Sequence, residues 1–396
     1  MNILFVNNSE INPLSSGIQR ITSILTQAFT RQGITCYGAN FETHTPSDHT
    51  LFPDTLKLDF SRQASQRLVG FIRKYSITRV IVQECMPLKK LGVVHRATAQ
   101  IPGCRLLYCY HSAPEKEFVP PALSAEWFRL WHSPGKIQAL KKVCIALLPG
   151  FLYSRLVRLK VRRDYSFIYR KADTVVLLSE RHIVPFQKWV NLRNPDTSKF
   201  AGIGNCLSFS ENLPLADLEH KKKEVVIVSR LSDRAKRISN ALKIWQLVEQ
   251  SAAVPDWRLK ILGNGPDEKY YHHLARRLGL KQVDFEGKRN PVPYYRQASV
   301  CMLTSAYEGF AMILTEAQQT GAVPIAFGTF ATLYDIIEDE WNGIIVPPND
   351  LQQFADRLIG LMTDKEKRDL LASRALEDCR RFTVDNIVKQ WLNILH

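Results

Sequence analysis

Residues Ser299–Phe327 read SVCMLTSAYEGFAMILTEAQQTGAVPIAF, and this stretch predicts the fold. The apolar run Val300–Leu303 predicts a buried strand, and the small residues of Ser305–Gly309 predict a turn. We expect a helix to begin around Phe310–Met312 and another buried strand at Val323–Ala326. A strand, a helix and a strand in this order are typical of a parallel sheet crossed by helices.

The turn in this stretch has the residue types of a phosphate site. Gly309 lets the backbone approach a ligand closely, and Glu308 can reach a group attached to that ligand. Glu316, about two turns into the expected helix, is placed to accept hydrogen bonds from ribose hydroxyls. The positive end of the helix dipole would bind phosphate through the free amides of Phe310, Ala311 and Met312. The alternative is that two surface glutamates flank a core helix.

The same alternation of apolar runs and amphipathic segments extends over the 396 residues, a length that suits two domains of roughly 200 residues each. A stretch rich in Asn, Pro, Gly and charge precedes residue 222. We therefore expect domains at 1–215 and 222–380, followed by an amphipathic helix at 384–396. The remaining strands are expected at Ile3–Val6, Val80–Val82, Leu106–Tyr110, Thr174–Leu178, Val225–Val228, Leu259–Leu262 and Val283–Phe285.

Composition limits the class of protein. A net charge of +15 predicts a polyanionic neighbour such as nucleic acid, an anionic membrane or phosphorylated substrates. The eight cysteines, Cys85 among them, form no C-x-x-C pair, so we expect neither a zinc site nor a disulfide framework. No run reaches the roughly 18 apolar residues of a membrane span, and the short apolar run near the N-terminus predicts a strand, not a signal peptide. These features favour a cytoplasmic protein.

The segment 124–171 is strongly basic. It contains eleven Lys or Arg residues against Glu126 and Asp164, with aromatic and leucine side chains interleaved. On a helix, Arg155 and its basic neighbours would share one face and Leu156 and its apolar neighbours another. One interpretation is a solvated helix packed on its domain, and the other is contact with an anionic membrane surface. We expect no nucleic-acid partner, because no nucleic-acid-binding motif accompanies the charge.

These motifs resemble family 4 of the retaining glycosyltransferases, which have the GT-B fold. The resemblance covers nearly the whole chain and is strongest over 224–350, where Glu308 and Glu316 match the glutamate pair of the family. It implies that Glu308 contacts hydroxyls of the donor sugar and that Glu316 binds the nucleotide ribose. VSRLSDRAK resembles the segment whose Arg230 and Lys236 neutralise the donor diphosphate. The spacing is one residue longer than usual, which makes Arg234 and Arg237 candidates to share the role of Lys236.

Other matches extend the resemblance into both domains. LKILGNGPDE and VDFEGK resemble the loops around the nucleobase, with Gly263, Gly265 and Gly287 easing the approach of the backbone. NPLSSGIQRI resembles the N-terminal glycine loop, although only Gly17 is present where two glycines are common. His111 ends an expected strand, where the family has an active-site histidine that contacts the donor sugar or supports the leaving group.

The resemblance implies an α/β enzyme of two Rossmann-like domains facing each other across a cleft, with the C-terminal helix crossing back to the first domain. It would move a hexose-type sugar from a nucleoside-diphosphate sugar, UDP in the first instance, to a polysaccharide or lipid-linked acceptor. Peripheral contact with the inner face of the cell membrane is expected through 124–171. With no Asp-x-Asp motif at a strand end, we expect no cofactor and no obligatory metal. The alternatives are a membrane-surface binding protein without catalysis and a nucleotide-sugar epimerase or inverting transferase of the same fold.

Overall fold

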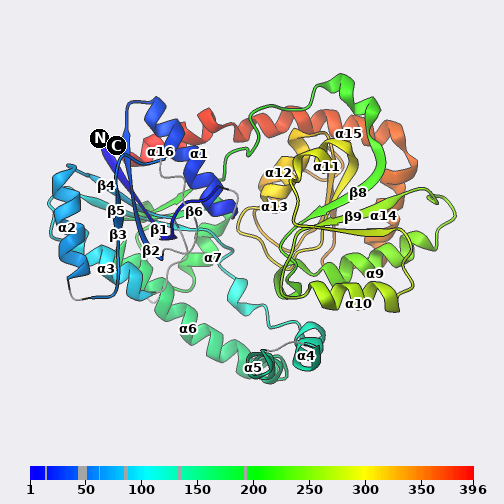
Figure 1. Cartoon of the computed structure of the whole chain (residues 1–396), viewed down its shortest axis with the longest axis horizontal. Coiled ribbons are helices and arrows are strands. Elements are labelled where there is room, and N and C mark those ends of the chain that lie inside the picture. The colour runs from blue at the N-terminus through cyan, green and yellow to red at the C-terminus, as the bar shows by residue number, and fades with distance from the viewer. Residues whose placement is uncertain (14–15, 43–50, 62, 84–87, 133–134, 191–193) are drawn as a thin grey trace. The chain divides into compact units, whose positions relative to one another are not determined.

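A computed structural model describes residues 1–13, 16–42, 51–61, 63–83, 88–132, 135–190 and 194–396, drawn in Figure 1. Cys85 and the loop residues Leu14 and Ser15 lie outside the described residues. The chain divides into two compact units. Unit 1 contains Met1–Pro114, Val157–Ser208 and Phe382–His396, and unit 2 contains Glu115–Leu156 and Phe209–Arg381.

Unit 1 contains a parallel sheet in the order β3-β2-β1-β4-β5-β6-β7. Its strands are β1 (Asn2–Ser9), β2 (Thr35–Glu42), β3 (Thr55–Lys57), β4 (Arg79–Val82), β5 (Arg105–Tyr110), β6 (Thr174–Leu177) and β7 (Phe200–Gly202). Its helices are α1 (Gly17–Arg31), α2 (Ala64–Lys74), α3 (Leu88–Thr98), the later turns of α6 (Gly150–Lys171), α7 (Ile183–Gln187) and α16 (Val384–Leu395). The four strands expected in this half are confirmed. Sequence analysis missed β2, β3 and β7, which are short or interrupted by polar residues.

Unit 2 contains a second parallel sheet, in the order β10-β9-β8-β11-β12-β13. Its strands are β8 (Lys222–Val228), β9 (Arg258–Leu262), β10 (Val283–Gly287), β11 (Ala298–Leu303), β12 (Val323–Phe327) and β13 (Ile344–Val346). Its helices are α4 (Leu123–His132), α5 (Lys136–Ala146), the first turns of α6, α8 (Asp233–Lys236), α9 (Ile238–Glu249), α10 (Glu268–Arg277), α11 (Val292–Gln297), α12 (Met312–Gln319), α13 (Leu333–Ile336), α14 (Leu351–Thr363) and α15 (Lys365–Asp378). All five strands expected here are present.

Both sheets have the strand order of a Rossmann-like domain, which confirms the predicted fold class. In each sheet the order reverses beside its first strand, at β1 and β4 in unit 1 and at β8 and β11 in unit 2. Ligands of such sheets bind at the carboxyl ends of the strands at this switch point. Residues Ser299–Phe327 run through β11, α12 and β12, so they form one side of the switch point in unit 2.

The C-terminal helix α16 belongs to unit 1, as expected. Its apolar side chains Ile387, Val388, Trp391 and Leu395 are buried. The Arg79 Nε donates to the carbonyl oxygen of Leu395 at 2.6 Å, which fixes the helix end beside β4. In Figure 1 the red helix α16 lies next to α1.

The basic segment 124–171 was expected in the first domain, but the structure divides it. Ala125 of α4 is fully buried in the hydrophobic core of unit 2, and Tyr270 of α10 donates to the Ser124 Oγ at 3.0 Å. The later turns of α6 instead pack in unit 1, where the Tyr165 hydroxyl donates to the carbonyl oxygen of Pro114 at 2.6 Å. The segment is divided between the two units according to which of its side chains are buried in each core. The charge pattern of the sequence does not reveal those side chains. Within the described part of the chain, no helix has the length and apolar character needed to cross a bilayer.

Candidate functional site

The loops after β8 and β9 pack backbone against backbone. A Cβ on Gly263, whose φ is +129°, would lie 1.8 Å from the carbonyl oxygen of Ser229, and a Cβ on Gly265 would lie 2.3 Å from that of Leu231. The Leu231 amide in turn donates to the carbonyl oxygen of Asn264 at 2.9 Å. Glycine is thus required at both positions by packing within the protein, and their predicted place around the nucleobase stays a prediction. In the structure, the backbone of Gly263 and Gly265 lies against the backbone of the loop after β8.

This packing fixes the backbone on both sides of Arg230, the residue after Ser229 in the β8 loop. Its side chain is exposed and makes no hydrogen bond or ion pair with any residue that the structure describes. An uncompensated guanidinium at the carboxyl end of the first strand of a Rossmann-like sheet can bind an anion through two parallel hydrogen bonds.

Lys236 and Glu308 meet although 72 residues separate them in the sequence. The Lys236 Nζ lies 2.5 Å from the Glu308 Oε1, with 20% and 12% of the two side chains exposed. The Ser305 hydroxyl donates to the same Oε1 at 2.6 Å. The backbones are joined as well, because the Ala306 amide donates to the carbonyl oxygen of Ala235 at 2.7 Å. These contacts connect the loop after β8 to the loop after β11. The Glu308 Oε2 accepts no hydrogen bond from a described residue.

The structure distinguishes Lys236 from the two arginines expected as candidates to share its role. Arg234 directs its Nε to the carbonyl oxygen of Val119 at 3.0 Å, so it joins the segment before α4 to the loop after β8. Arg237 donates to the Asn349 Oδ1. Of the three candidates, Lys236 is the one paired with Glu308.

Helix α12 begins at Met312, within the expected range, but two details of the predicted phosphate site differ. The Met312 amide donates to the carbonyl oxygen of Phe310 at 2.8 Å, so it is not a free donor. The Ala311 amide makes no hydrogen bond with the described residues, which leaves it available at the helix start. Because α12 starts at Met312, Glu316 lies little more than one turn into the helix, not two. Its side chain is buried, with 4% of the residue exposed.

His111 lies in unit 1, directly after β5. Its Nε2 is 2.5 Å from the Oε1 of Gln83, a fully buried residue that follows β4. Burial lowers the pKa of His111 to about 4, so the imidazole is neutral near pH 7. With the amide oxygen facing Nε2, that nitrogen carries the proton, and Nδ1 is a buried acceptor without a partner among the described residues. A neutral imidazole can accept a hydrogen bond from a sugar hydroxyl but adds no positive charge beside a diphosphate.

Gly17 also lies in unit 1, where it is the first residue of α1 after β1. The Ser16 hydroxyl caps this helix by accepting from the Gln19 amide at 3.3 Å. Gly17 and His111 therefore both follow strands of the first sheet, and Arg230, Lys236, Glu308–Met312 and Glu316 belong to the second.

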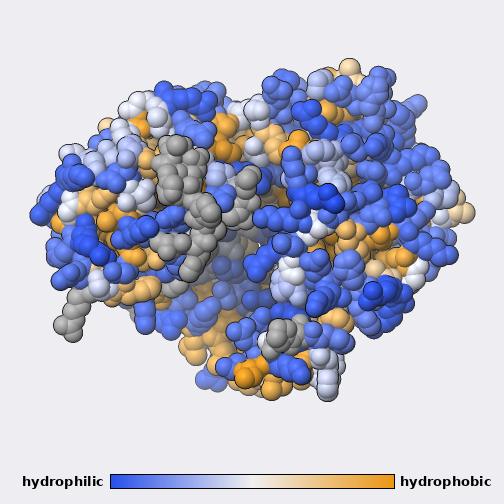
Figure 2. All heavy atoms as spheres, viewed as in Figure 1, coloured by the Kyte–Doolittle hydropathy of each residue, from blue (hydrophilic) through white to orange (hydrophobic). Residues whose placement is uncertain are grey.

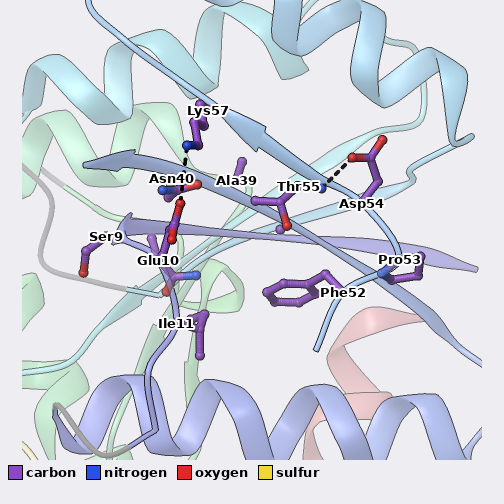
Figure 3. Close-up of a pocket in the computed structure, with 12 residues that line it drawn as sticks. Ser9, Glu10, Ile11, Ala39, Asn40, Phe52, Pro53, Asp54, Thr55 and Lys57 are labelled. Atoms are coloured by element: carbon purple, nitrogen blue, oxygen red, sulfur yellow. Dashed lines mark hydrogen bonds and ion pairs between the residues drawn. The ribbon is translucent and has the colours of Figure 1, made fainter. Parts of the chain in front are cut away.

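Sequence analysis missed a cavity of about 330 Å³ in unit 1, at the carboxyl ends of β1 and β2 (Figure 3). The Phe52 ring forms one wall, and a Cβ on Gly38 would lie 2.7 Å from that ring, so glycine on β2 lets it approach the sheet. The Lys57 Nζ lies 3.8 Å from the Glu10 Oε1. The cavity thus combines an aromatic surface with groups of both charges.

Two buried amides line the same cavity. Asn7 of β1 and Asn40 of β2 are partners in the parallel register, and they are 1% and 3% exposed. The Oδ1 of each has no hydrogen-bond partner among the described residues. A buried polar atom left without a partner costs about 1–3 kcal/mol, so a ligand with hydroxyl groups would bind here favourably. The sequence gives only a weak signal for this site, namely single polar residues within two strands.

Comparison with known proteins extends these observations. Residues 211–378 match the family model described as Glycosyl transferases group 1. The chain is 26% identical over 225 residues to an uncharacterized glycosyltransferase of Haemophilus influenzae, covering 56% of this chain and 61% of that protein. It is 26% identical over 242 residues to the amylovoran biosynthesis glycosyltransferase AmsD of Erwinia amylovora, covering 60% of this chain and 66% of that protein.

The fold is shared with solved structures over the whole chain. The structure of Anabaena Alr3699/HepE in complex with UDP superposes with a TM-score of 0.72 at 17% identity, covering 100% of this chain and 99% of that chain. At this identity the likeness concerns the fold alone. The alignments with the two curated relatives span less than two thirds of the length of each relative.

Proposed function

We propose that the chain, whose residues 211–378 match the family model described as Glycosyl transferases group 1, transfers a hexose-type sugar from a nucleoside-diphosphate sugar, with UDP as the nucleotide, to a polysaccharide or lipid-linked acceptor. The donor is bound by unit 2 and the acceptor by unit 1. The enzyme works in the cytoplasm, peripherally on the inner face of the cell membrane. UDP is named in the structure of Anabaena Alr3699/HepE, which shares the fold.

The contact between Lys236 and Glu308, with the exposed Arg230 in the β8 loop, is the observation that carries this proposal. Two cations at the switch point suit a diphosphate, and the negative charge on that diphosphate grows as the sugar leaves. The pair also tethers the carboxylate beside the cation, so Glu308 can hold a sugar hydroxyl through its Oε2 while Lys236 contacts the phosphate attached to the sugar. Glu316 binds the ribose from within α12.

The reaction proposed is transfer with retention of the anomeric configuration. The acceptor hydroxyl attacks the anomeric carbon on the face that the diphosphate leaves, and a phosphate oxygen accepts the proton of that hydroxyl. Arg230, Lys236 and the start of α12 stabilise the departing diphosphate, so no obligatory metal is part of the proposal. Glu308 positions the sugar and forms no covalent bond. The neutral His111 accepts a hydrogen bond from a sugar hydroxyl.

Three other functions use the same fold. A membrane-binding protein without catalysis would have no use for the Lys236–Glu308 contact or for the uncompensated Arg230. A nucleotide-sugar epimerase or an inverting transferase would use both. An epimerase converts the donor without any acceptor, and an inverting transferase gives the opposite anomer, so product analysis by NMR distinguishes the three reactions.

UDP or GDP is expected to raise the melting temperature of the protein in the presence of EDTA. A ligand at 100 times its Kd stabilises the native state by about 2.7 kcal/mol, which corresponds to a shift on the order of 5 °C. Differential scanning fluorimetry measures this shift, with uridine as the control that lacks the diphosphate. A shift seen only with Mg²⁺ or Mn²⁺ would contradict the metal-free donor site, and no shift with either nucleotide under any condition would contradict the proposed donor.

The cavity of unit 1 is proposed to bind the terminal sugar of the acceptor. Asn40→Ala and Glu10→Gln each remove one polar partner of a sugar hydroxyl, so we expect the acceptor KM to rise about tenfold. The KM is measured with aryl monosaccharide glycosides as acceptors, and UDP binding should not change. Gln27→Ala, an exposed change on α1 of the same unit, is the control. An unchanged acceptor KM in both cavity variants would remove the cavity from the acceptor site.

A further inference from the structure

Apolar side chains gather on the surface of residues 123–132 and 135–156, here called the helical platform, which contains α4, α5 and the first turns of α6. In the described chain, eighteen large hydrophobic side chains are exposed, and ten of them belong to this short segment. Figure 2 shows hydrophobic surface over α5 at the lower edge of the view. Exposed apolar residues on a soluble protein are normally scattered singly, so a concentration of this kind indicates an interaction surface. The ten residues are Leu123, Trp127, Trp131, Ile137, Leu140, Ile145, Leu147, Phe151, Leu152 and Leu156.

The exposed residues follow the helical period. On α4, Trp127 and Trp131 are one turn apart, and they are 52% and 66% exposed. On α5, Ile137 is 73% exposed, and Leu140, one turn later, is 50% exposed. Phe151, in the first turn of α6, is 78% exposed. Each helix therefore presents an apolar stripe to solvent.

These stripes are distinct from the faces that pack against the protein. The buried residues of α5 are Ala139 and Val143, which lie on another side of that helix from Ile137 and Leu140. A helix that is apolar on two faces is expected to be covered on both. In α5 the protein covers only one of them.

Buried ion pairs hold the platform on unit 2. Arg129 of α4 lies 2.6 Å from the Glu126 Oε1 and 2.8 Å from the Oδ1 of Asp267, which precedes α10. Lys142 of α5 lies 3.5 Å from the same Glu126 oxygen. Glu126 is 2% exposed and Asp267 is fully buried, so breaking this network would leave a buried charge without a partner. The apolar stripes are thus presented by helices with fixed contacts.

The exposed charge within the platform has one sign. Lys136, Lys141 and Arg155 are exposed. Among residues 124–171 the two carboxylates are Glu126, which is buried in ion pairs, and Asp164, which pairs with Arg163 at 2.9 Å. The surface therefore offers apolar side chains bordered by cations to whatever covers it.

An anionic bilayer fits this combination better than the other possible occupants. A second copy of this chain in a symmetric dimer would bring Lys and Arg residues against one another, which is unfavourable. Nucleic acid would use the cations but leave the leucine and isoleucine stripes in water. A membrane interface accommodates both, because tryptophan and aliphatic side chains enter the boundary of the acyl chains while Lys and Arg contact anionic headgroups.

We propose that the helical platform docks in the plane of an anionic membrane, with the apolar stripes of α5 and of the first turn of α6 inserted among the lipids. The inference rests on the membrane location in the proposed function, and sugar transfer plays no part in it. The apolar side chains provide affinity that persists at high salt, and the basic residues provide the preference for anionic lipid. The platform thereby keeps a lipid-linked acceptor and the enzyme at one surface.

Vesicle cosedimentation tests the proposal with the full chain. Wild type is expected to bind phosphatidylglycerol–phosphatidylcholine vesicles and to bind pure phosphatidylcholine vesicles at least tenfold more weakly. The triple change Ile137→Ser, Leu147→Ser and Phe151→Ser should reduce binding to the anionic vesicles about 100-fold at low and at high salt. The triple change Lys136→Glu, Lys141→Glu and Arg155→Glu should reduce it about 100-fold at low salt only.

Matched controls make the result specific to the platform. Val184→Ser, Leu215→Ser and Leu370→Ser remove three apolar side chains of similar exposure from other surfaces. Lys269→Glu, Arg276→Glu and Arg277→Glu reverse three exposed charges on α10. Both control variants should bind the anionic vesicles within about threefold of wild type. Every variant should keep the circular dichroism spectrum of wild type, since only exposed side chains change.

Two results would overturn the proposal. One is equal vesicle binding by wild type and the apolar triple variant. The other is absence of vesicle binding together with a wild-type dimer, measured by light scattering, that the apolar triple variant dissociates, because the occupant would then be a second copy. Binding is measured without donor or acceptor, so a failure of the proposed sugar transfer leaves the test intact. Glu308→Ala is expected to bind vesicles as wild type does.

Discussion

Glu308→Ala is expected to lower kcat on the order of 100-fold while the Kd for UDP stays within about twofold of the wild-type value. The proposed role of Glu308 is to hold the donor sugar, and UDP lacks that sugar. The Lys236 Nζ lies 2.5 Å from the Glu308 Oε1, so alanine at 308 removes a competitor for the ammonium group. Lys236 would then remain available to the diphosphate.

The measurement is release of UDP from the UDP-sugar that wild type uses, combined with calorimetry of UDP binding. Glu308→Gln keeps a hydrogen-bonding oxygen without the charge and should lose less activity than alanine does. Glu366→Ala, an exposed change on α15, is the control. If Glu308→Ala weakens UDP binding as much as the corresponding change at Glu316, the two glutamates have the opposite roles.

Arg230→Ala and Glu316→Ala should each raise the Kd for UDP by about 10- to 150-fold, equivalent to roughly 1.5–3 kcal/mol for a charge-assisted hydrogen bond. The two losses should differ in their salt dependence. Arg230 is exposed and has no partner among the described residues, so its contact with the diphosphate is screened by salt. Glu316 is 4% exposed, and its hydrogen bonds to ribose should respond little to salt.

Calorimetry at 50 mM and 500 mM salt measures both effects. Lys243→Ala, an exposed change on α9, should bind UDP as wild type does. Glu316→Gln fills the buried site without a cavity, so it separates loss of the ribose contact from loss of packing. UDP affinity unchanged in both Arg230→Ala and Glu316→Gln would place the nucleotide elsewhere.

The pKa of His111 bears on which of its two implied roles is possible. Burial lowers this pKa to about 4, so near pH 7 the ring is uncharged and offers an acceptor at Nδ1. That state suits contact with a sugar hydroxyl. In the proposed reaction, the positive charge beside the leaving diphosphate would then come from Arg230, Lys236 and the start of α12.

The sequence by itself determined the fold class and predicted most residues of the candidate donor site. Apolar runs predicted nine of the strands, and Gly309 between β11 and α12 predicted the turn at the switch point. These features are local, because buried parallel strands need continuous apolar residues and a turn against a ligand needs small ones. The arrangement of Arg230, Glu308 and Glu316 around the strand ends follows from that order of elements.

Tertiary structure alone decided which distant side chains meet. The choice of Lys236 over Arg234 and Arg237 depended on the pairing of β8 with β11, which brings residues 236 and 308 together. The cavity beside Asn40 depended in the same way on the pairing of β1 with β2. The sequence could show that α5 is apolar, but not that one of its apolar faces stays in water. Packing between segments far apart in the chain sets the contacts across a sheet and the side of a helix that is covered. A pattern along the sequence contains no information on the distance between such segments.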